Sequence, residues 1–128
     1  MAALNRIQLI GRLGKEPEIF TTQKGAKVTR FSLAVDRRWR NANGEIQHEA
    51  DWFNIEAWGN LADICQNYLH KGRLVYLEGR LQTDRYEKSG ETHYFTKVII
   101  RNIQLLDRKP EEEPEEEVEE EILPDSGL

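Results

Sequence analysis

The sequence predicts an all-β fold, a five-stranded antiparallel barrel with one helix between its third and fourth strands, followed by an acidic tail. Three observations support this prediction. Segments in which polar and apolar residues alternate recur through residues 4–106, and turn-forming residues separate them. One segment changes to the 3.6-residue period of a helix. Beyond residue 109 the composition changes to an almost unbroken run of Glu.

The first two strands are predicted at residues 4–13 and 27–36. In the first, Ile7 and Leu9 alternate with polar neighbours, and Gly11 interrupts the pattern. Residues 17–25 are expected to form a loop that contains Phe20. In the second strand one face carries Phe31, Leu33 and Val35, and the other carries Val28, Arg30, Ser32 and Ala34.

The third strand is predicted at residues 50–58, after an Asn43-Gly44 turn signal. Its alternation assigns Phe53, Ile55 and Ala57 to the core. The opposite face is polar apart from two tryptophans, and it carries Trp52, Asn54, Glu56 and Trp58.

The helix is expected to begin at Asn60, a good N-cap residue, with Asp63 in the position of a capping box. Gly72 suits the left-handed residue that ends a helix. The apolar stripe predicted to be buried consists of Leu61, Ile64, Cys65, Tyr68 and Leu69.

Two further strands are predicted at residues 73–86 and 91–106, joined by a turn at Ser89-Gly90. The element order is thus β-β-β-α-β-β. This order is typical of the OB-fold, a partly open barrel whose sheet face and loops bind oligonucleotides or oligosaccharides. The fold alone does not choose between those ligands.

Charge divides the 128-residue chain into an expected OB-fold domain, residues 1–109, and a tail, residues 110–128. The tail holds ten acidic residues and no Lys or Arg, so it carries −10 and is expected to be disordered. The 18 basic residues therefore all lie in the domain with the other 13 acidic residues, which gives it +5. Such asymmetry points to binding of nucleic acid or of a partner.

The remaining composition excludes several kinds of protein. The one cysteine, Cys65, allows no intrachain disulfide and no Cys-based zinc site. No apolar run is long enough to span a membrane, and no secretory signal is evident. The three histidines are scattered and no catalytic grouping is visible. We therefore expect a protein without enzymatic activity, metal or cofactor, in a reducing cytoplasm.

The tryptophans on the polar face of the third strand are the candidate nucleic-acid-binding residues. Trp52 and Trp58 form the kind of platform on which unpaired bases stack, and Tyr86 lies similarly on a polar face of the fourth strand. The alternative is that these rings pack against neighbouring strands, because large aromatics are usually well buried. Trp39 shares the parity of the core residues but stands among three arginines.

Basic residues cluster near these aromatics in the sequence and are the candidate phosphate contacts. Each taken alone is more often a solvated surface charge. The set is Arg37, Arg38, Arg40, Lys71, Arg73, Arg80 and Arg85.

Several runs resemble the bacterial and organellar single-stranded DNA-binding protein family: NRIQLIGRLG at residues 5–14, EPE at 16–18, WR at 39–40, DW at 51–52, WGNLA at 58–62, YLHKG at 68–72 and VYLEGRL at 75–81. The resemblance implies an OB barrel assembled as a homotetramer, which wraps single-stranded DNA without sequence preference during replication, recombination and repair. It implies a nucleoid-associated, cytoplasmic protein. It also implies base stacking on Trp39, Trp52, Trp58 and Tyr86.

The same resemblance makes the tail a docking segment for replication and repair proteins. The residues similar to the family's acidic docking motif are Glu119, Glu120, Glu121, Ile122, Leu123 and Pro124. Asp125-Ser126-Gly127-Leu128 follows them where the family usually ends in Phe. The alternative is a tail that only increases solubility.

Three other hypotheses remain open at the level of the sequence. An adaptor built on the same barrel would bind RNA or protein, although the four aromatics argue against it. An enzyme is the least supported, since no catalytic motif is present. Finally, the tail could lie on the basic DNA-binding surface and be displaced by DNA.

Overall fold

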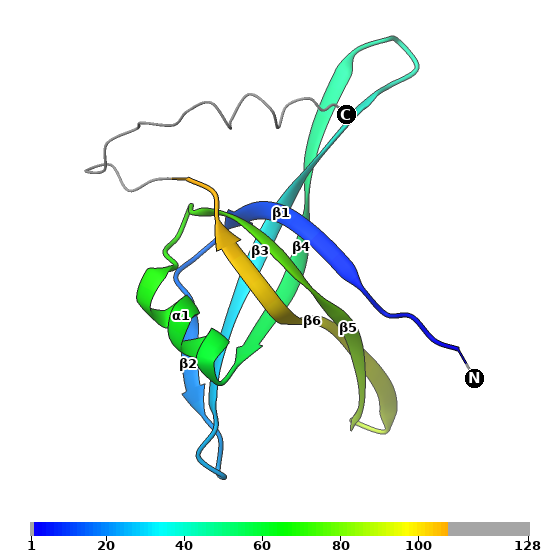
Figure 1. Ribbon diagram of the computed structural model, residues 1–128. Coiled ribbons are helices and arrows are strands. Elements are labelled where there is room, and N and C mark those ends of the chain that lie inside the picture. Colours follow the sequence, from blue (N-terminus) through cyan, green and yellow to red (C-terminus); the bar gives the residue numbers. More distant parts are fainter. Residues whose placement is uncertain (1, 108–128) are drawn as a thin grey trace.

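A computed structural model describes residues 2–107 as six strands and one helix (Figure 1). The tail lies outside the described residues. The predicted docking residues 119–124 and the expected disorder both fall in this part of the chain. No helix within the described range is long and apolar enough to cross a membrane. The elements are β1 (Ile7–Leu13), β2 (Glu18–Thr21), β3 (Lys27–Arg40), β4 (Ile46–Trp58), α1 (Asn60–Tyr68), β5 (Leu74–Lys88) and β6 (Glu91–Leu105).

Five of these strands close into the predicted barrel. The sheet order is β1-β5-β6-β4-β3-β2, and an additional pairing of β1 with β3 closes the ring. The closure brings Gly11 against β3, where a Cβ atom on residue 11 would meet the Ala34 carbonyl oxygen at 2.3 Å. The expectation of a purely antiparallel barrel was wrong, because β4 and β6 pair in parallel at Ile55–Val98.

The core of the barrel follows the predicted alternation. Leu33 and Ala57 are fully buried and Ile55 nearly so, together with Val75 and Leu77 from β5. On β6 the pattern shifts by one residue between Ile100 and Ile103, because the β5–β6 ladder has an irregularity beside Arg101. A bulge of this kind changes which residues face inward.

The short strand β2 corrects the predicted loop at residues 17–25. Its four residues pair antiparallel with β3, from Glu18–Arg30 to Thr21–Lys27. All four are exposed, including Phe20. A strand with no buried face has no polar–apolar alternation, so the pattern that revealed the other strands was absent here.

The helix α1 lies at one end of the barrel (Figure 1) and packs on β3, β4 and β6. The predicted N-cap was wrong, since Gly59 occupies that position with φ 62° and no side chain caps the helix. The predicted stripe was also partly wrong. Ile64 and Tyr68 are exposed, whereas Ala62, Cys65 and Leu69 are buried.

Gly72 has the expected positive φ of 87°, but it lies in a turn beyond the end of the helix. Within the helix, burial of Cys65 raises the pKa of its thiol to about 12.

Two hairpins extend beyond the barrel (Figure 1). The β3–β4 hairpin pairs as far as Arg40–Ile46 and turns at the predicted Asn43-Gly44. The β5–β6 hairpin turns at the predicted Ser89-Gly90, where both residues have positive φ. The projecting ends of both hairpins carry aromatic and basic side chains, Trp39 and Arg38 on one and Tyr86 and Arg85 on the other.

Candidate nucleic-acid interface

The outer face of β3 and β4 places the two predicted tryptophans in one row. Trp52 lies opposite Ala34, and Trp58 lies opposite Val28. Both indoles are exposed, Trp52 by 60% and Trp58 by 42%. The alternative, that these rings are buried by neighbouring strands, does not hold within the described chain. Whether they stack bases remains a prediction.

Trp52 owes its position to a glycine on the loop after β1. A Cβ atom on Gly14 would lie 2.4 Å from Cζ3 of the indole. Only hydrogen at this position leaves room for the ring, so the Trp52 indole packs against Gly14.

Trp58 is oriented by a buried carboxylate. Its Nε1–H donates to Glu56 Oε1 at 2.9 Å. Glu56 also accepts from Arg30 Nε at 2.9 Å and from Lys97 Nζ at 3.2 Å. The sequence placed Glu56 on the exposed face, but the residue is only 2% exposed, because the long side chains of β3 and β6 cover it.

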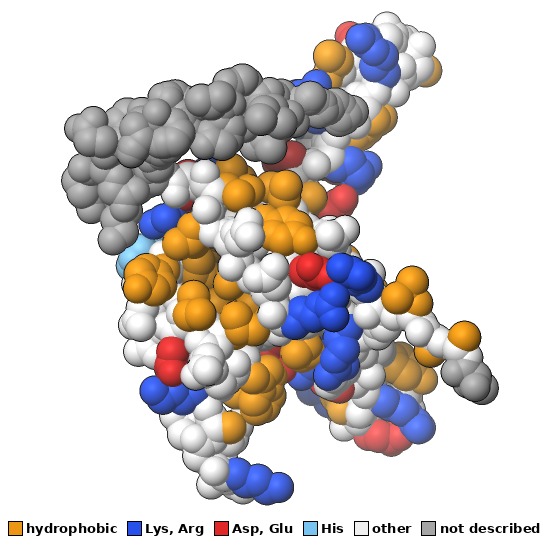
Figure 2. Space-filling view, in the orientation of Figure 1, with side chains coloured by type: hydrophobic (Ala, Val, Ile, Leu, Met, Phe, Trp, Pro, Cys, Tyr) orange, Lys and Arg blue, Asp and Glu red, His pale blue; other side chains and the backbone are white. Residues whose placement is uncertain are grey.

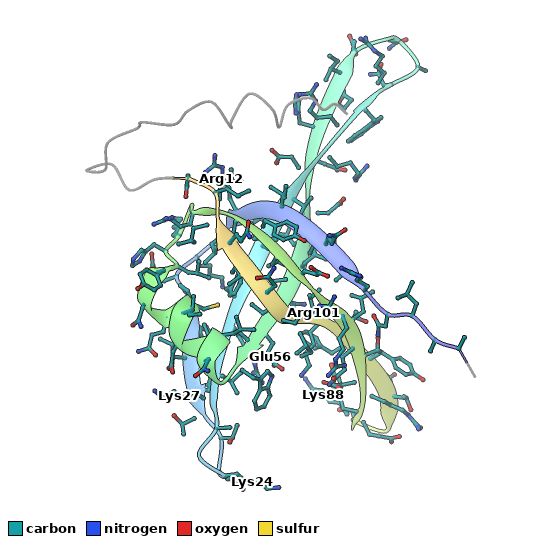
Figure 3. The ribbon with its side chains drawn as sticks, in the orientation of Figure 1. Arg12, Lys24, Lys27, Glu56, Lys88 and Arg101 are labelled. Atoms are coloured by element: carbon teal, nitrogen blue, oxygen red, sulfur yellow. The ribbon has the colours of Figure 1, made fainter. Side chains whose placement is uncertain are left out.

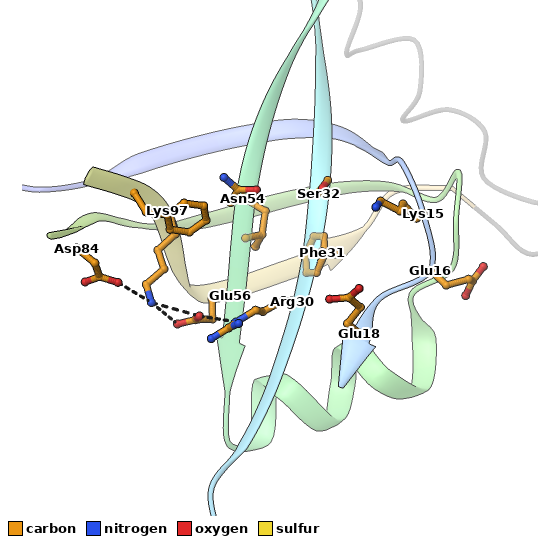
Figure 4. A pocket seen from close by; sticks show the side chains of 12 residues that line it. Lys15, Glu16, Glu18, Arg30, Phe31, Ser32, Asn54, Glu56, Asp84 and Lys97 are labelled. Atoms are coloured by element: carbon orange, nitrogen blue, oxygen red, sulfur yellow. Dashed lines mark hydrogen bonds and ion pairs between the residues drawn. The ribbon is translucent and has the colours of Figure 1, made fainter. Parts of the chain in front are cut away.

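A groove of about 320 Å³ lies beside β3 and β4 (Figure 4). Asn54 and Glu56, which alternate with the tryptophans along β4, line it. Lys97 reaches it from β6 and also pairs with Asp84 at 3.1 Å. Hydrogen bonding from Gln82 and then Lys97 holds the pKa of Asp84 below its usual value. The groove thus combines three basic residues with four acidic ones, Glu16, Glu18, Glu56 and Asp84.

Trp39 lies on the projecting β3–β4 hairpin, where no core exists, and it is 39% exposed. Strict parity had grouped it with core residues. The Arg37 guanidinium lies 4.7 Å above the Trp39 ring and pairs with Glu49 and Asp51. The arginine therefore covers one face of the indole.

Tyr86 stands near the end of β5 and is 47% exposed. Its ring stacks on His93 of β6, with centroids 5.3 Å apart and planes 21° from parallel. His93 thus adds a second ring beside Tyr86 at this position.

The predicted basic residues fall into two groups. Most are exposed at the surface of the barrel and its hairpins: Arg37, Arg38, Arg40, Lys71, Arg80 and Arg85. Arg73 differs, since its side chain is only 13% exposed and its Nε donates to Asp107 at 2.9 Å. Arg73 ties the start of β5 to the segment after β6, and we leave it out of the interface.

The loop that carries Lys71 is held by an acid. The Lys71 backbone N–H donates to Glu16 at 2.9 Å, which lowers the pKa of that carboxyl group, with a smaller contribution from His70. This contact holds the backbone of residue 71, and the Lys71 side chain makes no ion pair with any described residue.

Sequence reasoning missed Arg30 and Lys97, which contribute two of the three cations of the groove. Their common partner Glu56 is 26 and 41 residues away in the chain, so no local motif could have revealed the cluster. Among the described residues no group of three or more His, Cys, Asp or Glu is arranged to hold a metal ion.

A second basic cluster surrounds Glu78 of β5. Figure 2 shows Lys and Arg side chains gathered where β1, β5 and β6 cross, the region in which Figure 3 labels Arg101. Arg101 and Arg6 both pair with the buried Glu78. They lower the pKa of its carboxyl group, and the hydrogen bond from Arg101 has the largest effect. We do not assign this cluster to the interface.

Comparison with known proteins decides the family. The sequence profile of the Single-strand binding protein family matches residues 4–106. The chain belongs to this family. "Single-stranded DNA-binding protein 1" of Chlorobaculum tepidum is 44% identical over 108 residues, which cover 83% of this chain and 67% of that protein. The protein of the same name from Staphylococcus aureus strain Mu50 is 48% identical over 107 residues, with the same shares.

Solved structures agree with this family assignment. A "Plasmodium falciparum SSB complex with ssDNA" superposes with a TM-score of 0.78 at 36% identity, covering 84% of this chain and 98% of that one. A deletion mutant of the Thermus aquaticus single-stranded DNA binding protein gives a TM-score of 0.73 at 28% identity, covering 81% of this chain and 51% of that one. The OB-fold predicted from element order is confirmed.

Proposed function

We propose that this family member binds single-stranded DNA without sequence preference, by stacking bases on Trp39, Trp52, Trp58 and Tyr86. One observation carries the proposal: Trp52 and Trp58 are both exposed on one face of β4, and the cations Arg30 and Lys97 lie beside Trp58, because all three bind Glu56. Aromatic faces accept any base, and cations beside them neutralise phosphate. The Plasmodium falciparum relative solved with ssDNA supports it.

The exposed basic residues are proposed to contact the phosphate backbone. Arg38 and Arg40 on the β3–β4 hairpin and Arg85 on the β5–β6 hairpin stand near the proposed stacking residues of each hairpin. Together with Lys71 and Arg80 they would make binding weaken steeply as salt rises.

The test is a titration with oligo-dT, followed by quenching of tryptophan fluorescence at low salt. We expect strong quenching by wild type. Trp52→Ala should weaken binding by about 1–3 kcal/mol, the worth of one stacked base, or about 5- to 150-fold. Tyr68→Ala is the control, since Tyr68 is a similarly exposed aromatic on α1. Unquenched wild-type emission, or unchanged affinity of Trp52→Ala, would refute the stacking role.

Around this activity we propose the wider role implied by the family. The protein would act as a homotetramer without enzymatic activity, and would protect single strands during replication, recombination and repair at the cytoplasmic nucleoid. Light scattering with and without oligo-dT measures subunit number and stoichiometry together. A dimer, or a preference for RNA over DNA, would favour the adaptor hypothesis instead.

The tail is proposed to recruit replication and repair proteins through Glu119–Pro124 and to compete with DNA for the basic surface. Deleting residues 110–128, which carry ten acidic residues, should then raise DNA affinity and lessen its salt dependence. No change in either quantity would leave the tail without a role in DNA binding.

A further inference from the structure

Glu56 is an unexpected residue at the centre of a surface that binds DNA. Its carboxylate lies on the face shared by Trp52 and Trp58, where it lines the groove, and its side chain is 3% exposed. A negative charge there repels phosphate. Charge complementarity with DNA therefore does not explain it.

The contacts of Glu56 indicate what it does. It accepts from the Trp58 indole, from Arg30 and from Lys97, so three donors from three strands converge on one carboxylate. Figure 4 shows Arg30 and Lys97 reaching the carboxylate from opposite sides. A buried carboxylate is tolerated only with this degree of pairing.

We propose that Glu56 is a positioning residue for DNA binding, which holds the Trp58 ring and the Arg30 and Lys97 cations in the arrangement that a bound strand requires. The inference rests on the proposed function. It predicts that removing this negative charge weakens the affinity for DNA.

The effect on Trp58 follows from its exposure. The ring is 42% exposed, so without a hydrogen bond it would sample several orientations. The bond to Glu56 restricts it before DNA arrives. The Trp58 side chain then loses its conformational entropy when the protein folds and not when DNA binds, which favours the complex.

The two cations are held in the same way. Arg30 also lies 4.9 Å from the Phe20 ring centroid, and Lys97 also pairs with Asp84. The Arg30 side chain is nevertheless 54% exposed. Its Nε–H binds Glu56, which leaves the Nη donors for a phosphate oxygen.

The experiment compares Glu56→Gln with Glu18→Gln. Glu18 lines the same groove, is exposed, and makes no ion pair with any described residue, so it controls for the lost charge. We expect Glu56→Gln to weaken oligo-dT binding at least five-fold, and Glu18→Gln to bind as wild type or more tightly. Equal or tighter binding by Glu56→Gln would overturn the inference.

A double-mutant cycle separates positioning from general damage to the fold. Trp58→Phe keeps an aromatic ring but removes the indole N–H. We expect it to weaken binding by a larger factor in the wild-type background than in Glu56→Ala, which has no acceptor for the indole N–H. The same factor in both backgrounds would overturn the inference. If Glu56→Ala does not fold, Glu56→Asp completes the cycle, because its shorter carboxylate keeps the charge but withdraws from the indole.

Trp58 motion supplies a readout in the absence of DNA. In a Trp39→Phe, Trp52→Phe background, time-resolved anisotropy reports Trp58 alone, and Glu56→Ala, which removes the acceptor of the indole N–H, should add a fast local motion. Unchanged anisotropy would contradict the inference. If the wild-type protein does not bind oligo-dT, the proposed function is refuted, and with it the role of Glu56 in DNA binding. If the wild-type protein binds oligo-dT and Glu56→Gln binds it equally well, only the inference about Glu56 is refuted.

Discussion

The contact between Gly14 and Trp52 allows the position of one proposed stacking ring to be changed without removing the ring. In Gly14→Ala the new Cβ would lie 2.4 Å from Cζ3 and 2.7 Å from Cη2 of the indole. Carbon atoms pack at about 3.5–4.0 Å, so the ring must move outward by about 1 Å. Trp52 is 60% exposed, and it can move without disturbing the core.

The expected result is a loss of affinity with little loss of stability. A displaced ring should lose part of one stacked base, about 1 kcal/mol, or roughly five-fold in Kd for oligo-dT. The free energy of unfolding should stay within about 0.5 kcal/mol of wild type, as for most surface substitutions. Fluorescence titration measures the first quantity and urea denaturation the second.

Gly11→Ala is the matched control for this prediction. Its Cβ would lie 2.3 Å from the Ala34 carbonyl oxygen, where backbone rather than an exposed ring must move. That substitution should destabilise the barrel strongly. If Gly14→Ala binds like wild type while Trp52→Ala weakens binding, the position of the indole over Gly14 is irrelevant and our reasoning is wrong.

Three further predictions concern charge and burial. Arg38→Gln should reduce the slope of log K for oligo-dT against log salt concentration by about 0.7, the value for one phosphate contact on a single strand. Arg73→Gln should leave that slope unchanged but lower the urea concentration at the midpoint of unfolding. A reduced slope for Arg73→Gln would show that Arg73 belongs to the interface. The hydrogen bond from Arg101 is the main reason that the pKa of Glu78 lies below its usual 4.5. The folded state therefore holds this carboxylate ionised, and its contribution to stability is present above pH 4.5 and lost as pH falls through the lower folded pKa. Glu78→Gln should flatten the decline of stability in that acid range, and an unaltered pH profile would contradict the assignment. Burial raises the pKa of the Cys65 thiol to about 12, so Cys65 should resist iodoacetamide at pH 8 until the protein unfolds. The mass of the intact protein measures this alkylation. Rapid alkylation of the native protein would contradict the burial of Cys65.

The sequence predicted those features that depend on regular alternation. Trp52 and Trp58 were placed on an exposed face because β4 is a regular strand whose other face supplies Ile55 and Ala57 to the core. Trp39 could not be placed in this way. The β3–β4 hairpin leaves the barrel before residue 39, so neither of its faces is buried and parity carries no information there.

The features that sequence reasoning missed come from contacts between distant segments. Ile64 and Tyr68 match a helical stripe, yet α1 is short and buries only a narrow face centred on Ala62 and Cys65. The cluster around Glu56 joins three strands. A pattern within one strand can show that Glu56 shares a face with tryptophans, but not that a lysine from β6 covers it.

The closure of the barrel determines when the chain can fold during synthesis. β1 leaves the ribosome first, yet its longest ladder is with β5, where Ile7 pairs with Gly79. Until β5 and its partner β6 have been made, β1 has only its short pairing with β3, and β4 lacks its parallel neighbour. Contacts of this sequence separation make folding slow and leave strand edges exposed meanwhile. The nascent chain must therefore stay unaggregated until nearly the whole barrel has emerged.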